Sequence, residues 1–144
     1  MIVVLVLILL FHFSSWCTCH MTAFAAEQSF ENLTIQKINM YRVSSGIKPL
    51  SENESLKATS TTRAMECATL FSHTRPDGCV WYTAGNGDSY GETLAKNIKD
   101  SNELVDRWMK SPTHRAVLMD YRYSTIAISA YSSENGFYTA AEFA

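Results

Sequence analysis

Residues 71–78 read Phe71-Ser72-His73-Thr74-Arg75-Pro76-Asp77-Gly78, and this stretch decides how the rest of the chain is interpreted. Its last three residues predict a turn, because proline fixes φ, aspartate hydrogen-bonds back to the backbone and glycine tolerates positive φ. The preceding helical pattern therefore ends here.

Two further motifs carry groups that could act together with this histidine. Ser111-Pro112-Thr113-His114-Arg115 holds the only other histidine after residue 25, and Gly91-Glu92-Thr93-Leu94-Ala95 lies between the two. If the fold brings the three motifs together, two imidazoles and one carboxylate line a single cleft. Such a cleft is a metal-ligand set or an acid/base set.

The first half of the chain predicts two helices. Residues 30–44 place apolar side chains near helical spacing, and Gly46 is a stop signal. Ser51 with Glu54 three residues later forms a capping-box pattern, which predicts a second helix from Ser51 to about Leu70.

The second half predicts two more helices and then a β-hairpin. Ser101 is placed to cap a third helix, and Ser111-Pro112 to start a fourth with proline in its first position. Residues 125–131 read as a strand, 134–136 as a turn and 137–143 as the returning strand. Helices followed by a hairpin favour the α+β class, with an antiparallel sheet flanked by helices.

The N-terminal stretch indicates export. Residues 2–13 are almost purely apolar and uncharged but too short to span a membrane, and Ala23-Phe24-Ala25 is a small-x-small cleavage pattern. We expect a signal peptide over residues 1–25 and a domain over 26–144, secreted and without membrane contact after cleavage. The alternative is an uncleaved membrane anchor, because no Lys or Arg precedes the apolar run.

Charge and length restrict the function of the exported part. All 12 basic and 14 acidic residues follow residue 25, which leaves a net charge of −2. Binding to nucleic acid needs a basic face, so the sequence predicts no nucleic-acid partner. About 119 residues remain after cleavage, enough for one domain with a real core.

Cys67 and Cys79 are the two cysteines left after residue 25. In an oxidising compartment, an even pair favours a disulfide, here closing a short loop around His73 and stabilising the fold by roughly 2–3 kcal/mol. The alternative is two separate thiols, one buried in a helix and one exposed.

Taken together, the motifs resemble a known family. Residues 71–78, 91–95, Arg107-Trp108 and 111–115, followed by two strands, resemble bacterial members of the CAP superfamily, whose domains are called SCP-like. The resemblance covers nearly the whole exported part. It implies an α-β-α sandwich and a ligand cleft usually lined by two histidines and two acidic residues.

The resemblance assigns cleft residues one by one. His73 matches the first histidine, Glu92 the first acid and His114 the second histidine, while Ser111 stands where the second acid is usual. Thr93 also replaces an asparagine that is usual after the first acid. The chain thus keeps three of the four cleft groups.

These groups allow two chemical interpretations. His73, His114 and Glu92 could hold a divalent ion such as Zn²⁺, with water in the open position. Without a metal, Glu92 would orient a histidine by hydrogen bonding, and Ser111 would only cap the following helix.

Four aromatic residues near these motifs, and two charged ones, have simpler expected roles. The aromatic residues are expected in the core or in the cleft wall rather than in a stacking platform; they are Trp81, Tyr82, Tyr90 and Trp108. For Arg75 and Asp77 we expect a salt bridge and a turn.

Three functions from different classes follow. The first, which the sequence favours, is an extracellular binding module whose cleft holds a small ligand or a metal without turnover. The second is a metal-assisted hydrolase acting on peptides or esters, but Glu92 would have to serve as both metal ligand and general base. The third is a structural or interaction protein with a degenerate cleft. In each case the expected partner is an extracellular ligand or protein.

Overall fold

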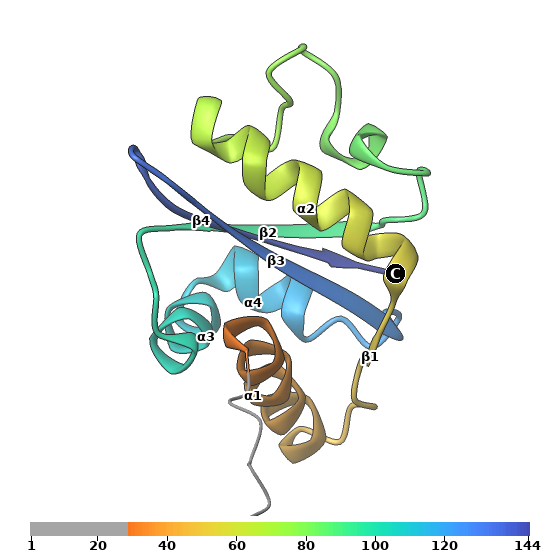
Figure 1. The fold of residues 1–144 in the computed structure, drawn as a ribbon. Helices are drawn as coiled ribbons and strands as arrows, with labels where there is room; N and C mark the ends of the chain where they lie inside the picture. Colours follow the sequence, from red (N-terminus) through yellow and green to blue (C-terminus); the bar gives the residue numbers. More distant parts are fainter. Residues whose placement is uncertain (1–28) are drawn as a thin grey trace, which may run out of the picture.

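The computed structural model describes residues 29–144 as a four-stranded sheet with helices on both faces (Figure 1). The helices are α1 (Phe30–Ser44), α2 (Glu54–Thr69), α3 (Ser101–Lys110), α4 (Pro112–Leu118) and the 3₁₀ turn η1 (Trp81–Ala84). The strands are β1 (Ser51–Glu52), β2 (Gly91–Lys96), β3 (Thr125–Ser133) and β4 (Gly136–Phe143). The predicted signal peptide and the domain boundary at residue 26 lie outside the described residues.

The helices form two layers around the sheet, which confirms the predicted α+β sandwich. Helix α2 covers one face, and α1, α3 and α4 cover the other (Figure 1). The larger core cluster joins the three-helix layer to the sheet, with Ile38, Leu104 and Phe143 fully buried. A smaller cluster joins α2 to the opposite face through Ala64, Cys67 and Leu94.

The sheet is mixed rather than fully antiparallel, which corrects the sequence-based prediction. Its strand order is β1-β3-β4-β2, and only the short β1 runs parallel to its neighbour β3. The β3–β4 hairpin and the β2–β4 pair are antiparallel, as expected. Gly136, with φ +140°, begins β4 at the end of the hairpin turn, where the backbone needs the conformational freedom of glycine.

Two helix starts differ from the predicted ones. Helix α2 is capped by Asn53, whose side chain accepts a hydrogen bond from the Ser55 amide at 2.9 Å. Ser51 is instead used by the sheet, because its amide donates to the carbonyl of Ser124. Helix α3 is capped by Asp100 instead of Ser101. In both cases an Asn or Asp side chain near the predicted serine makes the cap.

Strand β2 decides which side chains meet near the edge of the sheet. Alternate residues of a strand point to opposite faces, so Glu92 and Leu94 share one face. Leu94 packs in the cluster under α2, and Glu92 therefore also faces α2. Glu142 lies directly opposite Glu92 on β4.

Within residues 29–144, no helix is both long enough and apolar enough to cross a bilayer. The longest described helix, α2, has 16 residues.

Candidate functional site

Glu92 lies at the centre of a buried ion-pair network. Its side chain is 1% exposed, and its Oε2 accepts a hydrogen bond from Arg63 Nε at 2.7 Å. The other oxygen, Oε1, lies 2.7 Å from His73 Nδ1 and 3.4 Å from Arg63 Nη2. Both carboxylate oxygens are thus engaged by positively charged or hydrogen-bond-donating groups of the protein itself.

Arg63, on α2, links Glu92 to the segment that carries His73. Its Nη1 donates to Glu66 at 2.7 Å, and its Nη2 donates to the carbonyl of Ser72 at 2.6 Å. Burial opposes the charge of Arg63, but hydrogen bonds to Glu92 and Glu66 outweigh it and raise the pKa of the guanidinium. The residue before His73 is therefore held directly on α2.

The next turn is held by a second arginine. Arg75 donates to Glu66 at 2.7 Å through Nη2, and the Asp77 carboxylate accepts from the amide of Cys79 at 2.9 Å. Burial opposes the charge of Glu66, but hydrogen bonds from Arg75 and Arg63 outweigh it and lower the pKa of its carboxyl. These contacts match the salt-bridge and turn roles expected for Arg75 and Asp77.

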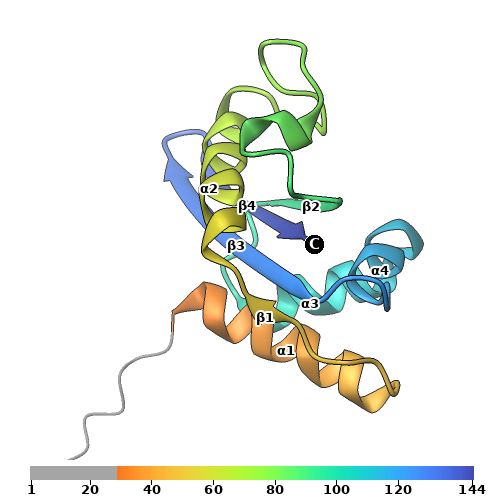
Figure 2. The ribbon, with the colours of Figure 1, turned by 90° about the vertical axis from the view of Figure 1, so that its right-hand side faces the viewer.

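His114 reaches the site from the opposite helical layer. Figure 2 shows the segment after α2 above β2 and helix α4 below it. The His114 ring packs tilted against Trp108, with centroids 6.4 Å apart. Burial lowers the pKa of His114, and the charge of His73 lowers it further, so the two rings lie close enough to interact electrostatically.

The structure thus joins two of the four predicted site residues by direct contact and a third by charge. We call His73, Glu92 and His114 the histidine site. Among the described residues, the hydrogen bonds of Glu92 are to Arg63 and His73, not to His114. Ser111 occupies the N-cap position of α4, but its side chain makes no capping hydrogen bond and contacts the Thr113 hydroxyl at 3.2 Å.

Two fully buried charged residues beside Glu92 were not predicted from the sequence: Arg63 and Glu142. Both belong to elements whose neighbouring residues pack in the core, and a charged side chain at an inward position was the available signal. Each is fully buried in the structure.

Glu142 adds a second carboxyl group beside Glu92. Its Oε2 accepts a hydrogen bond from the Ser89 hydroxyl at 2.7 Å, while its Oε1 is buried without a partner among the described residues. Burial, together with the charge of Glu92, raises the pKa of Glu142 from 4.5 to about 9. Glu142 therefore keeps its proton at neutral pH.

Substituting Glu142→Gln is expected to stabilise the protein at pH 8 and to flatten its stability profile. The pKa of Glu142 is about 9 in the folded protein and 4.5 as the reference for the unfolded chain. Between these two pH values the folded state holds a proton that the unfolded state has released. Wild-type stability therefore falls as pH rises from about 4.5 to 9, by at most about 1.4 kcal/mol per pH unit. Urea unfolding at a series of pH values measures the slope.

The exposed Glu134→Gln, in the β3–β4 turn, is the matched control and should keep the wild-type slope. A Glu142→Gln profile as steep as that of this control would show that Glu142 ionises normally in the folded protein.

The predicted disulfide is not formed. Cys67 and Cys79 are both free; Cys67 is buried on the inner face of α2 and Cys79 is exposed in the following loop. Burial raises the pKa of the Cys67 thiol to about 11. The alternative of two separate thiols is what the structure shows, and the Arg63 and Arg75 hydrogen bonds hold the His73 segment instead.

The residues expected to bind zinc do not fit a metal site as they are arranged. Within residues 29–144, no three His, Cys, Asp or Glu side chains are grouped so as to hold a metal ion. The physical reason is the engagement of Glu92, which would have to release Arg63 or His73 to become a ligand. Two imidazoles alone fall short of the three protein ligands usual in an open zinc site.

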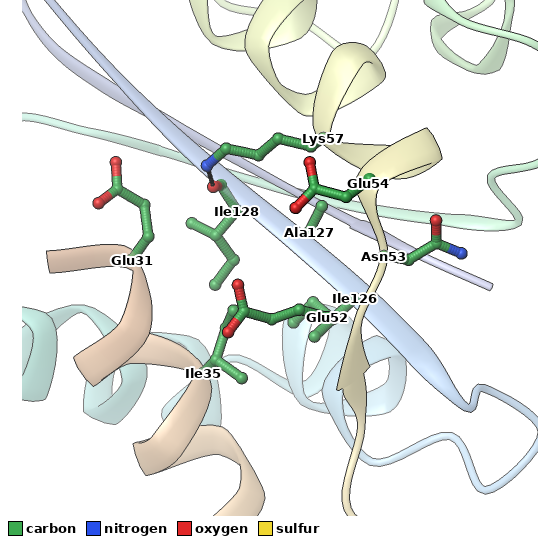
Figure 3. Close-up of a pocket in the computed structure, with 9 residues that line it drawn as sticks. All are labelled: Glu31, Ile35, Glu52, Asn53, Glu54, Lys57, Ile126, Ala127 and Ile128. Atoms are coloured by element: carbon green, nitrogen blue, oxygen red, sulfur yellow. Dashed lines mark hydrogen bonds between the residues drawn. The ribbon is translucent and has the colours of Figure 1, made fainter. Parts of the chain in front are cut away.

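A separate pocket between α1, β1 and α2 is too small for a ligand. Figure 3 shows its carboxylates and the Lys57 ammonium, which donates to the carbonyl of Ile128. The cavity volume of about 20 Å³ leaves space for about one water molecule. Its lining consists of Glu31, Ile35, Glu52, Asn53, Glu54, Lys57, Ile126, Ala127 and Ile128.

The aromatic residues fall into two groups. Trp108 is buried in the core, where its indole N–H donates to the carbonyl of Leu94 at 3.2 Å. Trp81, Tyr82 and Tyr90 line an open pocket near the start of β2.

The fold and the site together define a class, an α-β-α sandwich with a histidine–glutamate pair at one edge strand. The chain belongs to the CAP family, the cysteine-rich secretory protein family, whose model matches residues 35–143. A relative in Bacillus subtilis (strain 168), the uncharacterized protein YkwD, is 28% identical over 112 residues, covering 73% of this chain. The chain spans 44% of that relative's length.

Solved structures support the same fold. An outer surface protein from Borrelia burgdorferi matches with a TM-score of 0.67 at 19% identity, over 76% of this chain and 86% of that protein. An extracellular protein containing an SCP domain from Bacillus anthracis str. Ames has a TM-score of 0.64 at 21% identity, over 78% of this chain and 41% of its own. A cysteine-rich secretory protein from Staphylococcus aureus subsp. aureus Mu50 has a TM-score of 0.62 at 20% identity, over 82% of this chain and 40% of that protein.

Proposed function

We propose that this CAP domain is an extracellular binding module that holds a small ligand at the histidine site without turning it over. The observation that carries the proposal is the engagement of both Glu92 oxygens by Arg63 and His73. Export through residues 1–25 is part of the proposal. It is supported by two structural neighbours that are named as outer surface and extracellular proteins.

The Glu92 contacts argue against the hydrolase alternative. A general base must offer a lone pair to the water whose proton it removes. Here the carboxylate is 1% exposed and already accepts hydrogen bonds from a guanidinium and an imidazole. The same contacts suit a structural role, in which Glu92 fixes the orientation of the His73 ring.

His73 is the group that this arrangement offers to a ligand. Its side chain is 58% exposed, and its Nδ1 is held by Glu92. The second ring nitrogen, Nε2, is therefore the atom available for binding. The half-buried His114 lies within electrostatic reach of that ring. The pair suits a ligand that carries a polar or anionic group.

Two measurements test the proposal. In the first, His73→Ala is expected to raise the pKa of His114 in an NMR titration, because the variant removes a nearby positive charge. In the second, the protein is mixed with carboxylic acids, amino acids, sugars and phosphate. We expect at least one class to shift the His73 and His114 ring signals while leaving the probe chemically unchanged.

Product formation from ester or peptide substrates that Glu92→Gln abolishes would overturn the proposal in favour of a hydrolase. An unchanged pKa of His114 in the His73→Ala variant would show that the two rings do not form one site. Unshifted ring signals with every probe would favour the structural protein with a degenerate cleft. Exposed Arg107→Ala serves as the control variant.

A further inference from the structure

A second pocket, outside the histidine site, has walls that are mainly aromatic. It has a volume of about 320 Å³ and is lined by Trp81, Tyr82, Gly87, Ser89 and Tyr90. The first two residues belong to η1, and Tyr90 immediately precedes β2. Tyr90 is 71% exposed and Tyr82 is 46% exposed, so their rings do not pack in the core.

The aromatic rings form a corner. The Trp81 and Tyr82 centroids are 5.4 Å apart, with the ring planes at 85° to each other. Tyr90 supplies a third wall. The face of an aromatic ring carries partial negative charge, and Trp and Tyr faces attract a cation placed within about 6 Å of the centroid.

The surrounding charges favour a cation. The five lining residues include no Lys or Arg. Asp88 lies between Gly87 and Ser89 in the sequence but does not line the pocket; its Oδ2 accepts a hydrogen bond from the Ser55 hydroxyl, and its Oδ1 is buried. The carboxylate therefore adds negative potential near the pocket without contacting a ligand there.

Two basic side chains near the pocket are already paired. Arg75 reaches the Thr83 carbonyl of η1 but is bound by Glu66. Arg122 lines the neighbouring pocket, beyond Tyr90, and is paired with Asp120. Neither one offers an unpaired positive charge that would repel a cation.

The two lining residues that are not aromatic offer no free hydrogen-bonding side chain. Gly87 has no side chain, and the Ser89 hydroxyl is committed to Glu142 at 2.7 Å. A cation shielded by methyl groups needs only ring faces and negative potential. The three aromatic rings therefore suit a methylated cation.

We propose that the corner formed by Trp81, Tyr82 and Tyr90 binds a quaternary or methylated ammonium group. Ring faces supply the cation–π attraction, and the Asp88 carboxylate adds negative potential. This site does not depend on the function proposed for the histidine site, since none of its lining residues belongs to that site.

A matched pair of probes tests the nature of the site. Choline and its neutral carbon isostere 3,3-dimethylbutan-1-ol are titrated separately into the full-length protein, with Trp81 fluorescence and calorimetry as readouts. We expect saturable binding of choline and binding of the isostere at least about tenfold weaker, because only choline carries the charge. Equal affinities would overturn the proposal and define an apolar pocket, and no saturation with choline would overturn it outright.

Two variants test whether choline binds at these aromatic rings. Tyr90→Leu is expected to weaken choline binding about tenfold without unfolding the protein, because Tyr90 is largely exposed. Tyr121→Leu is the control, since Tyr121 is 81% exposed and does not line this pocket. Equal losses in the two variants would contradict the assignment.

Two other outcomes separate this site from its alternatives. His73→Ala should leave choline binding unchanged, so failure of the histidine-site proposal and failure of this one are distinguishable. Saturable binding of glucose that Tyr90→Leu removes, with no binding of choline, would replace the cation by a sugar.

Discussion

Replacing Arg63 with alanine is expected to lower the free energy of unfolding by about 3–5 kcal/mol. The side chain of Arg63 is fully buried, and its hydrogen bonds go to Glu92, Glu66 and the Ser72 carbonyl. The variant leaves Glu92 as a buried carboxylate with His73 as its remaining partner. Urea denaturation at pH 7, followed by circular dichroism, measures the loss.

A control and a rescue separate the buried charge from general effects of removing an arginine. Arg107→Ala removes an arginine that is 64% exposed and paired with Glu103, and it should cost less than about 1 kcal/mol. Adding Glu92→Gln to Arg63→Ala should recover part of the loss, because the orphaned negative charge is removed. A cost for Arg63→Ala no greater than that for Arg107→Ala would refute the network as a stabilising element.

Replacing Arg42 with alanine is expected to cost about 3 kcal/mol or more. This fully buried guanidinium of α1 donates to four backbone carbonyls at 2.8–2.9 Å. These belong to Lys48, Leu118, Asp120 and Tyr123. The variant leaves these buried carbonyls unpaired and releases the segment after α4 from α1. Urea unfolding measures the combined decrease in the free energy of unfolding.

Arg122→Ala is the matched control for this prediction. Arg122 is 71% exposed and pairs with Asp120 in the same segment, so its loss should change stability by less than about 1 kcal/mol. Hydrogen exchange adds a local readout. We expect the backbone amides that follow α4 to exchange faster in the Arg42→Ala variant only. Equal exchange rates in the two variants would show that Arg42 does not hold this segment.

The sequence predicted the helices and the final hairpin well, because their signals are local. Apolar spacing marked α1, Ser111-Pro112 marked the start of α4, and Asn135-Gly136 marked the hairpin turn. The predicted start of α2 was two residues too early, because Asn53 outcompetes Ser51 as the cap. Pairing of Ser51 with β3 is a long-range contact that local capping rules do not include.

The sequence predicted which motifs supply the site, but it did not predict which charged groups pair there. His73 and Glu92 are in contact, and the charge of His73 reaches His114. The charge of Glu92 is balanced by Arg63, which lies on α2, and both side chains are buried. Ionic pairing across elements depends on three-dimensional distance, which the spacing of residues along the chain does not provide.

By itself, the sequence determined the family, the order of the elements and the chemical types present at the site, because motifs, caps and turns act over a few residues. The tertiary structure alone decided how those groups are used. It buries Glu142 beside Glu92, so that one carboxyl keeps its proton, and it separates Cys67 from Cys79. It also leaves the rings of Tyr82 and Tyr90 exposed to solvent. Each of these outcomes depends on burial and on through-space distance, and both are properties of the packed chain.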